Sequence, residues 1–183
     1  MISPISRNVG AGVLSALLLF ATPLAARDLT PEENAALQQT VTRFDRAMRD
    51  GDLETIVEVI PPRVLKQIGD RAGLDVASVR AATVQQMRSL MSQVKIESFS
   101  LDLPKAEHKE LTDGTPYLLV PTETVVAAEG TRTKTISDTL AMLDENKWYL
   151  LRVSDANQVG MLRQVYPPFA GVSFPETRTE VLP

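Results

Sequence analysis

The chain of 183 residues contains no cysteine and a single histidine, His108. Without cysteine there can be no disulfide, no cysteine nucleophile and no thiolate metal ligand. One histidine cannot supply the three or four ligands of a zinc site, and its charged neighbours predict an exposed strand residue. A glycine-rich phosphate loop and a Gly-x-Ser-x-Gly motif are absent as well. We therefore expect neither a metal nor a cofactor.

Basic residues are too few and too scattered to form a basic face. Lysine and arginine total 19 against 23 aspartates and glutamates, which gives a formal net charge of −4 at pH 7. Nucleic acids and anionic lipid surfaces both select for a positively charged surface. We therefore expect no nucleic-acid partner.

The chain begins with the order of regions that is typical of an export signal. Arg7 lies in a short polar segment, residues 9–21 are apolar, and Pro23 precedes small residues that end at Ala26. This order predicts a secretory signal over residues 1–26, cleaved after Ala26. The apolar segment is shorter than the roughly 20 residues that cross a bilayer, and a retained anchor is the alternative. A disulfide-free exported domain fits a bacterial periplasm best, so we expect a periplasmic or secreted protein without a membrane span after cleavage.

The first half of the remaining chain carries helix signals. Thr30-Pro31-Glu32-Glu33 is a capping box with proline at the first helical position. Asp52 and Asp75 are placed to cap later helices, and Gly51 is placed to end the first one with a positive φ. The spacing of apolar residues predicts helices over residues 31–49, 53–60, 62–73 and 76–93.

After Val94 the pattern changes to short runs, of which residues 117–128 are rich in valine, threonine and leucine. Turn signals separate these runs, and Pro121 indicates an edge or a bulge. Short turns between successive runs predict an antiparallel meander. The expected strands cover residues 95–103, 108–111, 117–128, 132–143 and 147–153.

The last part of the chain adds one short helix, capped by Asp155, and a tail. Pro167-Pro168 ends that helix, and residues 167–183 are predicted to form an extended C-terminal tail that either docks on the sheet or is offered to a partner. Residues 27–166 are then a single domain, long enough for one core. Helices followed by a curved antiparallel sheet predict an α+β fold, with the helices packed on one face of the sheet.

This order of elements resembles that of the nuclear transport factor 2-like superfamily, which includes ketosteroid isomerase-like and SnoaL-like proteins. The residues that carry the resemblance are Phe44 in the first helix, Gly51-Asp52 after it, Pro61 among the short helices, and Asn146-Lys147-Trp148-Tyr149-Leu150 near the end of the sheet. The resemblance covers about residues 30–154 and implies a cone-shaped fold. Members include enzymes, binding modules and exported domains, so the resemblance alone does not assign a function.

An enzyme of the isomerase or SnoaL type is one alternative that the resemblance implies. Such an enzyme needs a carboxylate base in an apolar cavity and a hydrogen-bond donor for the oxyanion. Asp102 is the candidate base, and Tyr117, Tyr149 and Asp138 are candidate donors. Phe44 stands where the resemblance implies a tyrosine, and phenylalanine donates no hydrogen bond. We therefore assign no catalytic residue.

The candidate ligand-binding residues are Phe44, Tyr117, Trp148 and Arg152. Both faces of the strand over residues 147–153 are largely apolar, so one face can cover the helices while the other forms a pocket, a dimer surface or a seat for the tail. If Trp148 and Arg152 share a pocket, they supply an apolar wall and a fork for an anion. Otherwise Trp148 is a core residue and Arg152 pairs with an acidic neighbour.

These observations favour a non-catalytic periplasmic binding or interaction domain. Its expected partner is a small apolar molecule or another envelope protein, bound at the open face of the sheet. A structural homodimer that packs through the same face is a further alternative.

Overall fold

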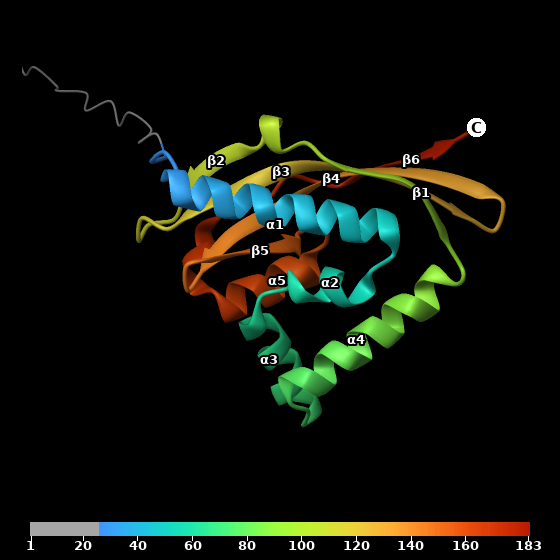
Figure 1. Ribbon diagram of the computed structural model, residues 1–183, viewed down its shortest axis with the longest axis horizontal. Coiled ribbons are helices and arrows are strands. Elements are labelled where there is room, and N and C mark those ends of the chain that lie inside the picture. Colours follow the sequence, from blue (N-terminus) through green and yellow to red (C-terminus); the bar gives the residue numbers. More distant parts are fainter. Residues whose placement is uncertain (1–25) are drawn as a thin grey trace, which may run out of the picture.

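Four helices precede the sheet in the described part of the chain, and a fifth lies between its last two strands. The computed structural model describes residues 26–183, so the predicted signal segment up to residue 25 lies outside the described residues. In Figure 1, α1 lies along the curved sheet and α4 stands away from it. The helices are α1 (Pro31–Asp50), α2 (Leu53–Glu58), α3 (Pro62–Ala72), α4 (Val76–Met91) and α5 (Ala156–Val165), with short 3-10 helices η1 (Leu103–Lys105) and η2 (Pro167–Gly171). Within residues 26–183, no helix has the length and apolar character needed to cross a bilayer.

The helix ends confirm the capping signals. The Thr30 hydroxyl accepts the Glu33 backbone N–H at 3.1 Å, and the Glu33 carboxylate accepts the Thr30 backbone N–H at 2.9 Å. Gly51 ends α1 with φ 70°, a left-handed conformation that glycine adopts without steric cost. The carboxylates of Asp52, Asp75 and Asp155 accept hydrogen bonds from backbone N–H groups at the starts of α2, α4 and α5, respectively.

The sheet is antiparallel and strongly curled, which confirms the predicted α+β fold (Figure 1). Its strands are β1 (Lys95–Leu101), β2 (Glu107–Glu110), β3 (Pro116–Ala128), β4 (Thr131–Asp144), β5 (Lys147–Arg152) and β6 (Arg178–Leu182). The main order is β1–β3–β4–β5, while β2 pairs with β3 and β6 pairs with β4. The two long central strands, β3 and β4, therefore each pair with two shorter strands along one edge: β1 and β2 on β3, and β5 and β6 on β4.

Pro121 explains why β1 and β2 are separate strands on the same edge of β3. The Pro121 carbonyl accepts the Asp102 backbone N–H at 2.9 Å, but proline has no N–H to donate toward that edge. The ladder with β1 ends at the pair Leu101 and Thr122, and the ladder with β2 begins at Leu119. η1 fills the gap, so the sheet departs from a simple meander at this point.

Both faces of the sheet are covered near its centre. Trp148 and Leu150 of β5 pack with Leu118 and Val120 against Leu37 of α1. The opposite face is covered by residues from the end of the chain, with Leu162, Tyr166 and Phe169 packed on Tyr117, Leu119, Leu140 and Met142. A third cluster joins the helices through Ala47, Leu53, Ile56, Val57 and Val84. The face that we expected to be open is therefore filled at its centre by α5 and η2.

The C-terminal segment contributes to the core and to the sheet. Phe169 is only 2% exposed, and its ring meets Tyr117 edge to face with centroids 5.3 Å apart. Farther on, β6 pairs with the same edge of β4 that β5 uses, over residues 132–136 of β4. Residues 167–183 thus include a buried anchor and an edge strand.

Replacement of Phe169 by alanine should test whether this anchor holds the fold. Removal of a buried phenylalanine side chain costs about 3–5 kcal/mol, so Phe169→Ala should lower the free energy of unfolding by about that amount in urea titrations. Val181 of β6 is 74% exposed, and Val181→Ala should change it by less than about 0.5 kcal/mol. Equal effects of the two variants would contradict a core role for Phe169.

A helix-lined groove as the candidate functional site

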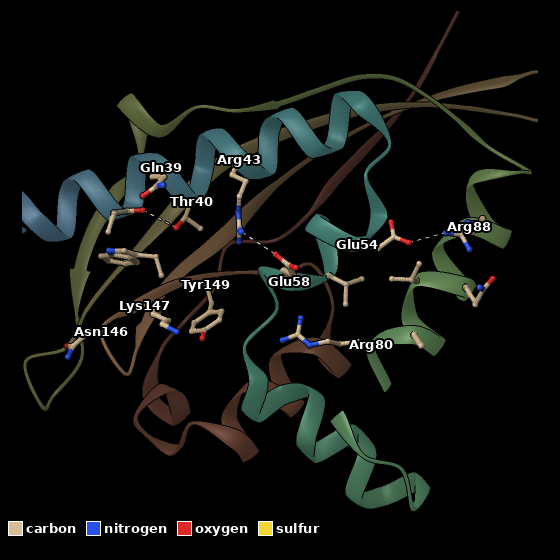
Figure 2. Close-up of a pocket in the computed structure, with 16 residues that line it drawn as sticks. Gln39, Thr40, Arg43, Glu54, Glu58, Arg80, Arg88, Asn146, Lys147 and Tyr149 are labelled. Atoms are coloured by element: carbon tan, nitrogen blue, oxygen red, sulfur yellow. Dashed lines mark hydrogen bonds and ion pairs between the residues drawn. The ribbon is translucent and has the colours of Figure 1, made fainter. Parts of the chain in front are cut away.

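A groove of about 840 Å³ opens between the helices and the β4–β5 hairpin (Figure 2). One wall is α1, a second wall is α4, α2 lies between them, and the hairpin closes one end. This volume lies within the range of about 300–1,000 Å³ that is usual for small-molecule sites. The lining residues are Ala36, Gln39, Thr40, Arg43, Glu54, Val57, Glu58, Arg80, Ala81, Val84, Gln85, Arg88, Asn146, Lys147, Trp148 and Tyr149.

The floor of the groove is apolar and belongs to the core. Val57 is 1% exposed and Trp148 is 4% exposed, and Val84 of α4 belongs to the same buried cluster as Val57. The indole Nε1 of Trp148 donates a hydrogen bond to the Glu33 carbonyl oxygen in α1, at 2.8 Å. This bond satisfies the polar atom of a buried ring and fixes the ring between β5 and α1.

The two acidic residues of the groove are paired with arginines from opposite walls. Glu58 lies 3.2 Å from Arg43 of α1, and Glu54 lies 3.2 Å from Arg88 of α4. Both pairs are drawn in Figure 2 on either side of α2. Each of these four side chains is more than half exposed, so the pairs add little stability. Their effect is to neutralise the acidic groups that face the groove.

Three polar side chains gather at the hairpin end of the groove. Figure 2 shows the Arg80 guanidinium extending from α4 toward Tyr149, with Lys147 beside it on β5. Among residues 26–183, neither Arg80 nor Lys147 forms an ion pair with an acidic side chain. Burial raises the pKa of the Tyr149 hydroxyl, and Asp144 and Glu145 raise it further while Arg80 lowers it. At neutral pH the lining at this end of the groove offers two positive charges and a neutral phenol, and the carboxylates of Asp144 and Glu145 lie near enough to act on that phenol.

The turn between α3 and α4 directs Arg80 into the groove. Gly73 ends α3 with φ 67°, and the Leu74 backbone N–H bonds back to the Gly69 carbonyl at 2.9 Å. The chain passes so close to Gly69 that a Cβ there would overlap the carbonyl oxygen of Leu74. This close approach requires glycine. It sets the angle at which α4 leaves α3 and therefore the position of the groove wall.

The hairpin is held by a buried polar contact below the groove. Asp144, whose side chain is 10% exposed, accepts a hydrogen bond from the Tyr166 hydroxyl at 2.8 Å and lies 3.5 Å from Arg63 Nε. The Arg63 guanidinium also lies 5.5 Å from the centre of the Tyr166 ring. Burial, first, and the bond to Asp144, second, raise the pKa of Tyr166 far above its usual 10. Tyr166 therefore stays a neutral donor, and it joins the hairpin to the end of α5.

The four predicted ligand-binding residues are not brought together. Phe44 packs edge to face on Phe99 of β1, Tyr117 is buried on the opposite sheet face from Trp148, and Arg152 is exposed at the end of β5. Of the four, only Trp148 lines the groove. The sequence did not single out Arg80, although Arg80, Val84 and Arg88 recur at every fourth residue along one face of α4.

Asp102 and His108 lie at the surface near the β1–β2 edge. Asp102 forms an ion pair with Lys105 at 2.6 Å and does not line the groove. An isomerase base requires instead an apolar cavity beside a tyrosine hydroxyl. His108 is exposed on β2, as its neighbours indicate. No group of three or more acidic or histidine side chains within residues 26–183 is arranged to hold a metal ion.

Comparison with protein-family models, with curated proteins and with solved structures finds no match to this chain.

Glu33 links the start of α1 to the groove floor. Its carboxylate accepts two hydrogen bonds from the Arg27 guanidinium, at 2.6 and 2.7 Å, and its carbonyl oxygen holds Trp148. The bond to Arg27, first, and the bond to the Thr30 N–H lower the pKa of Glu33 from 4.5 to about 2, against an opposing effect of burial. The ionised form is thus favoured by the folded state.

Acid should therefore destabilise the protein in part through Glu33. A carboxyl group with a lowered pKa in the folded state stabilises it above the unfolded pKa, and this contribution is lost as pH falls from about 4.5 toward 2. We expect Glu33→Gln to unfold at lower urea than the parent protein at pH 6, with the difference shrinking toward zero near pH 2. Glu32→Gln, on the exposed side of the same turn, is the control. A difference for Glu33→Gln that does not change with pH would contradict this role.

Proposed function

We propose that this chain is an exported, non-catalytic binding domain that holds a small amphipathic molecule in the helix-lined groove. The observation that carries the proposal is the groove itself. It combines the volume of a ligand site, an apolar floor of Val57, Val84 and Trp148, and a rim of charged side chains. A concave apolar surface with a few polar groups is the usual form of a small-molecule site.

The arrangement of the acidic groups favours binding over proton transfer. A general base must reach the substrate through a free carboxylate or imidazole. Glu54 and Glu58, the carboxylates that line the groove, each face an arginine instead. These pairs shape the rim and orient the side chains around a bound molecule.

The groove replaces the sheet face as the proposed binding surface. Our expectation from sequence was an open apolar face next to Tyr117 and Trp148. Because Phe169 and Tyr166 cover the Tyr117 side and α1 covers the Trp148 side, little room is left on the centre of the sheet. The space between α1, α2 and α4 is where a ligand fits.

We propose membership of the nuclear transport factor 2-like superfamily as the origin of this fold. Its support is the order of elements: N-terminal helices, then a curled antiparallel sheet whose long central strands are β3 and β4. The C-terminal additions, α5, η2 and β6, extend that plan.

The proposal of export to the periplasm has one structural support near the predicted cleavage point. The backbone nitrogen of Arg27 donates to Glu110 Oε2 at 2.9 Å. Cleavage after Ala26 would turn this nitrogen into a charged ammonium group. The new terminus would then gain an ion pair with Glu110 without any movement of the chain.

Retention of a small molecule should be detectable in the protein isolated from its own compartment. We expect native mass spectrometry of residues 27–183, purified from a periplasm, to show excess mass that is lost on denaturation. Ala81 lines the groove and its neighbour Ala82 does not, although both are exposed on α4. Ala81→Phe should therefore abolish the excess mass, while Ala82→Phe should retain it. Equal retention by both variants would place the ligand outside the groove.

The predicted cleavage site can be tested through Glu110. An exposed ion pair contributes about 0.2–1 kcal/mol, so Glu110→Gln should lower the melting temperature of residues 27–183 by a few degrees. The effect should fade as pH rises above about 8, where an α-amino group loses its charge. A chain that keeps Ala26 and the residues before it lacks that ammonium group and should show a smaller effect. Equal effects in both chains, or a mature terminus other than Arg27, would contradict the assignment.

A further inference from the structure

The groove is positively charged in a protein whose overall charge is negative. The chain has a formal net charge of −4, yet the groove is lined by four basic and two acidic side chains. Both acidic residues are already paired with arginines. The remaining charge belongs to Arg80 and Lys147, which lie at the same end of the groove (Figure 2).

From this asymmetry we propose that the ligand of the groove is an amphipathic oxyanion, and that Arg80, Lys147 and Tyr149 hold its carboxylate or phosphate group. This inference rests on the proposed function. The planar guanidinium of Arg80 offers a fork of N–H donors that matches two oxygens of such a group. Lys147 adds a mobile charge, and the Tyr149 hydroxyl stays protonated and can donate to an oxygen.

The apolar floor determines where the rest of the ligand lies. Trp148 of β5, Val57 of α2 and Val84 of α4 supply the large apolar side chains of the lining, from the hairpin, the middle helix and the far wall. A chain or ring bound over them would be removed from water while its charged end remains at the Arg80 side. The Arg43–Glu58 and Arg88–Glu54 pairs then border the uncharged part of the molecule, which gives the ligand one orientation.

A panel of octyl compounds tests the head group while the apolar part stays constant. Trp148 is the only tryptophan of the chain and lines the groove, so its fluorescence reports occupancy. With residues 27–183 at neutral pH, we expect octanoate or octyl phosphate to bind at least about tenfold more tightly than octanol, since charge-assisted hydrogen bonds are roughly twice as strong as neutral ones. Comparison of the two anions tells which oxyanion fits. Octanol or octylammonium binding as tightly as both anions would overturn the inference.

Matched variants test whether Arg80 and Lys147 cause the tighter binding of the anion. Arg80→Gln and Lys147→Gln should each weaken binding of the preferred anion by about tenfold and leave octanol binding unchanged. Arg46→Gln removes the same charge from an exposed position of α1 outside the groove and should have no effect. If Arg46→Gln weakens the anion equally, overall charge and not this site is responsible, and the inference fails.

The outcomes separate this inference from the proposed function. Octanol binding without an advantage for either anion overturns the head-group assignment and leaves the groove as a ligand site. If none of the four compounds changes the Trp148 fluorescence, although unfolding still changes it, then the groove is not a site for such molecules. That result would overturn the proposed function as well.

Discussion

Two hydrogen bonds connect the helical half of the chain to the edge of the sheet, and the groove depends on both. Trp148 Nε1 donates to the Glu33 carbonyl of α1 at 2.8 Å, and the Leu150 backbone N–H donates to the Val59 carbonyl at the end of α2 at 2.9 Å. β5 is an edge strand, so its outer N–H groups have no neighbouring strand. The chain satisfies one of them with a helix terminus, where carbonyl groups also lack partners. The two hydrogen bonds together fix α1 and α2 relative to the β4–β5 hairpin.

The distribution of burial explains why the groove lies among the helices and not over the centre of the sheet. The chain after β5 returns over the sheet through α5 and η2 and buries the face that carries Tyr117 and Leu140. α1 covers the other face along its length. α2 is only six residues long, too short to fill the space between α1 and α4. Long charged side chains border this space and keep their charged ends in water.

The helices and strands could be predicted from the sequence, because the caps and turns that bound them depend on residues close together in the chain. The Thr30–Glu33 capping box, the aspartate caps and Gly51 act within one or two turns. The site depends on packing between distant segments, and there the sequence was a weaker guide. Trp148 and Tyr117 are both aromatic residues of the sheet, yet the pleat sends them to opposite faces.

The residues that were missed show what information was needed. Arg80 and Lys147 are ordinary surface charges in a one-dimensional pattern. Their placement in the same groove depends on the close passage of the chain at Gly69, which sets the direction of α4. The break between β1 and β2 could have been found, because Pro121 removes the one donor that a continuous ladder would need. The covering of the second sheet face could not have been predicted from the sequence, since Phe169 lies 52 residues after Tyr117 and contacts it only in the fold.

The sparse burial of α4 has a consequence for how a molecule enters the groove. This helix of 16 residues buries only Val79 and Val84 and, in Figure 1, extends away from the sheet. Segments with few buried contacts unfold locally at a fraction of the global free energy, and their amides exchange with solvent first. The amide hydrogens of α4 should thus exchange with deuterium well before those of α1. One wall of the groove is thus a helix with few fully buried residues, so entry to the groove does not require the core to open.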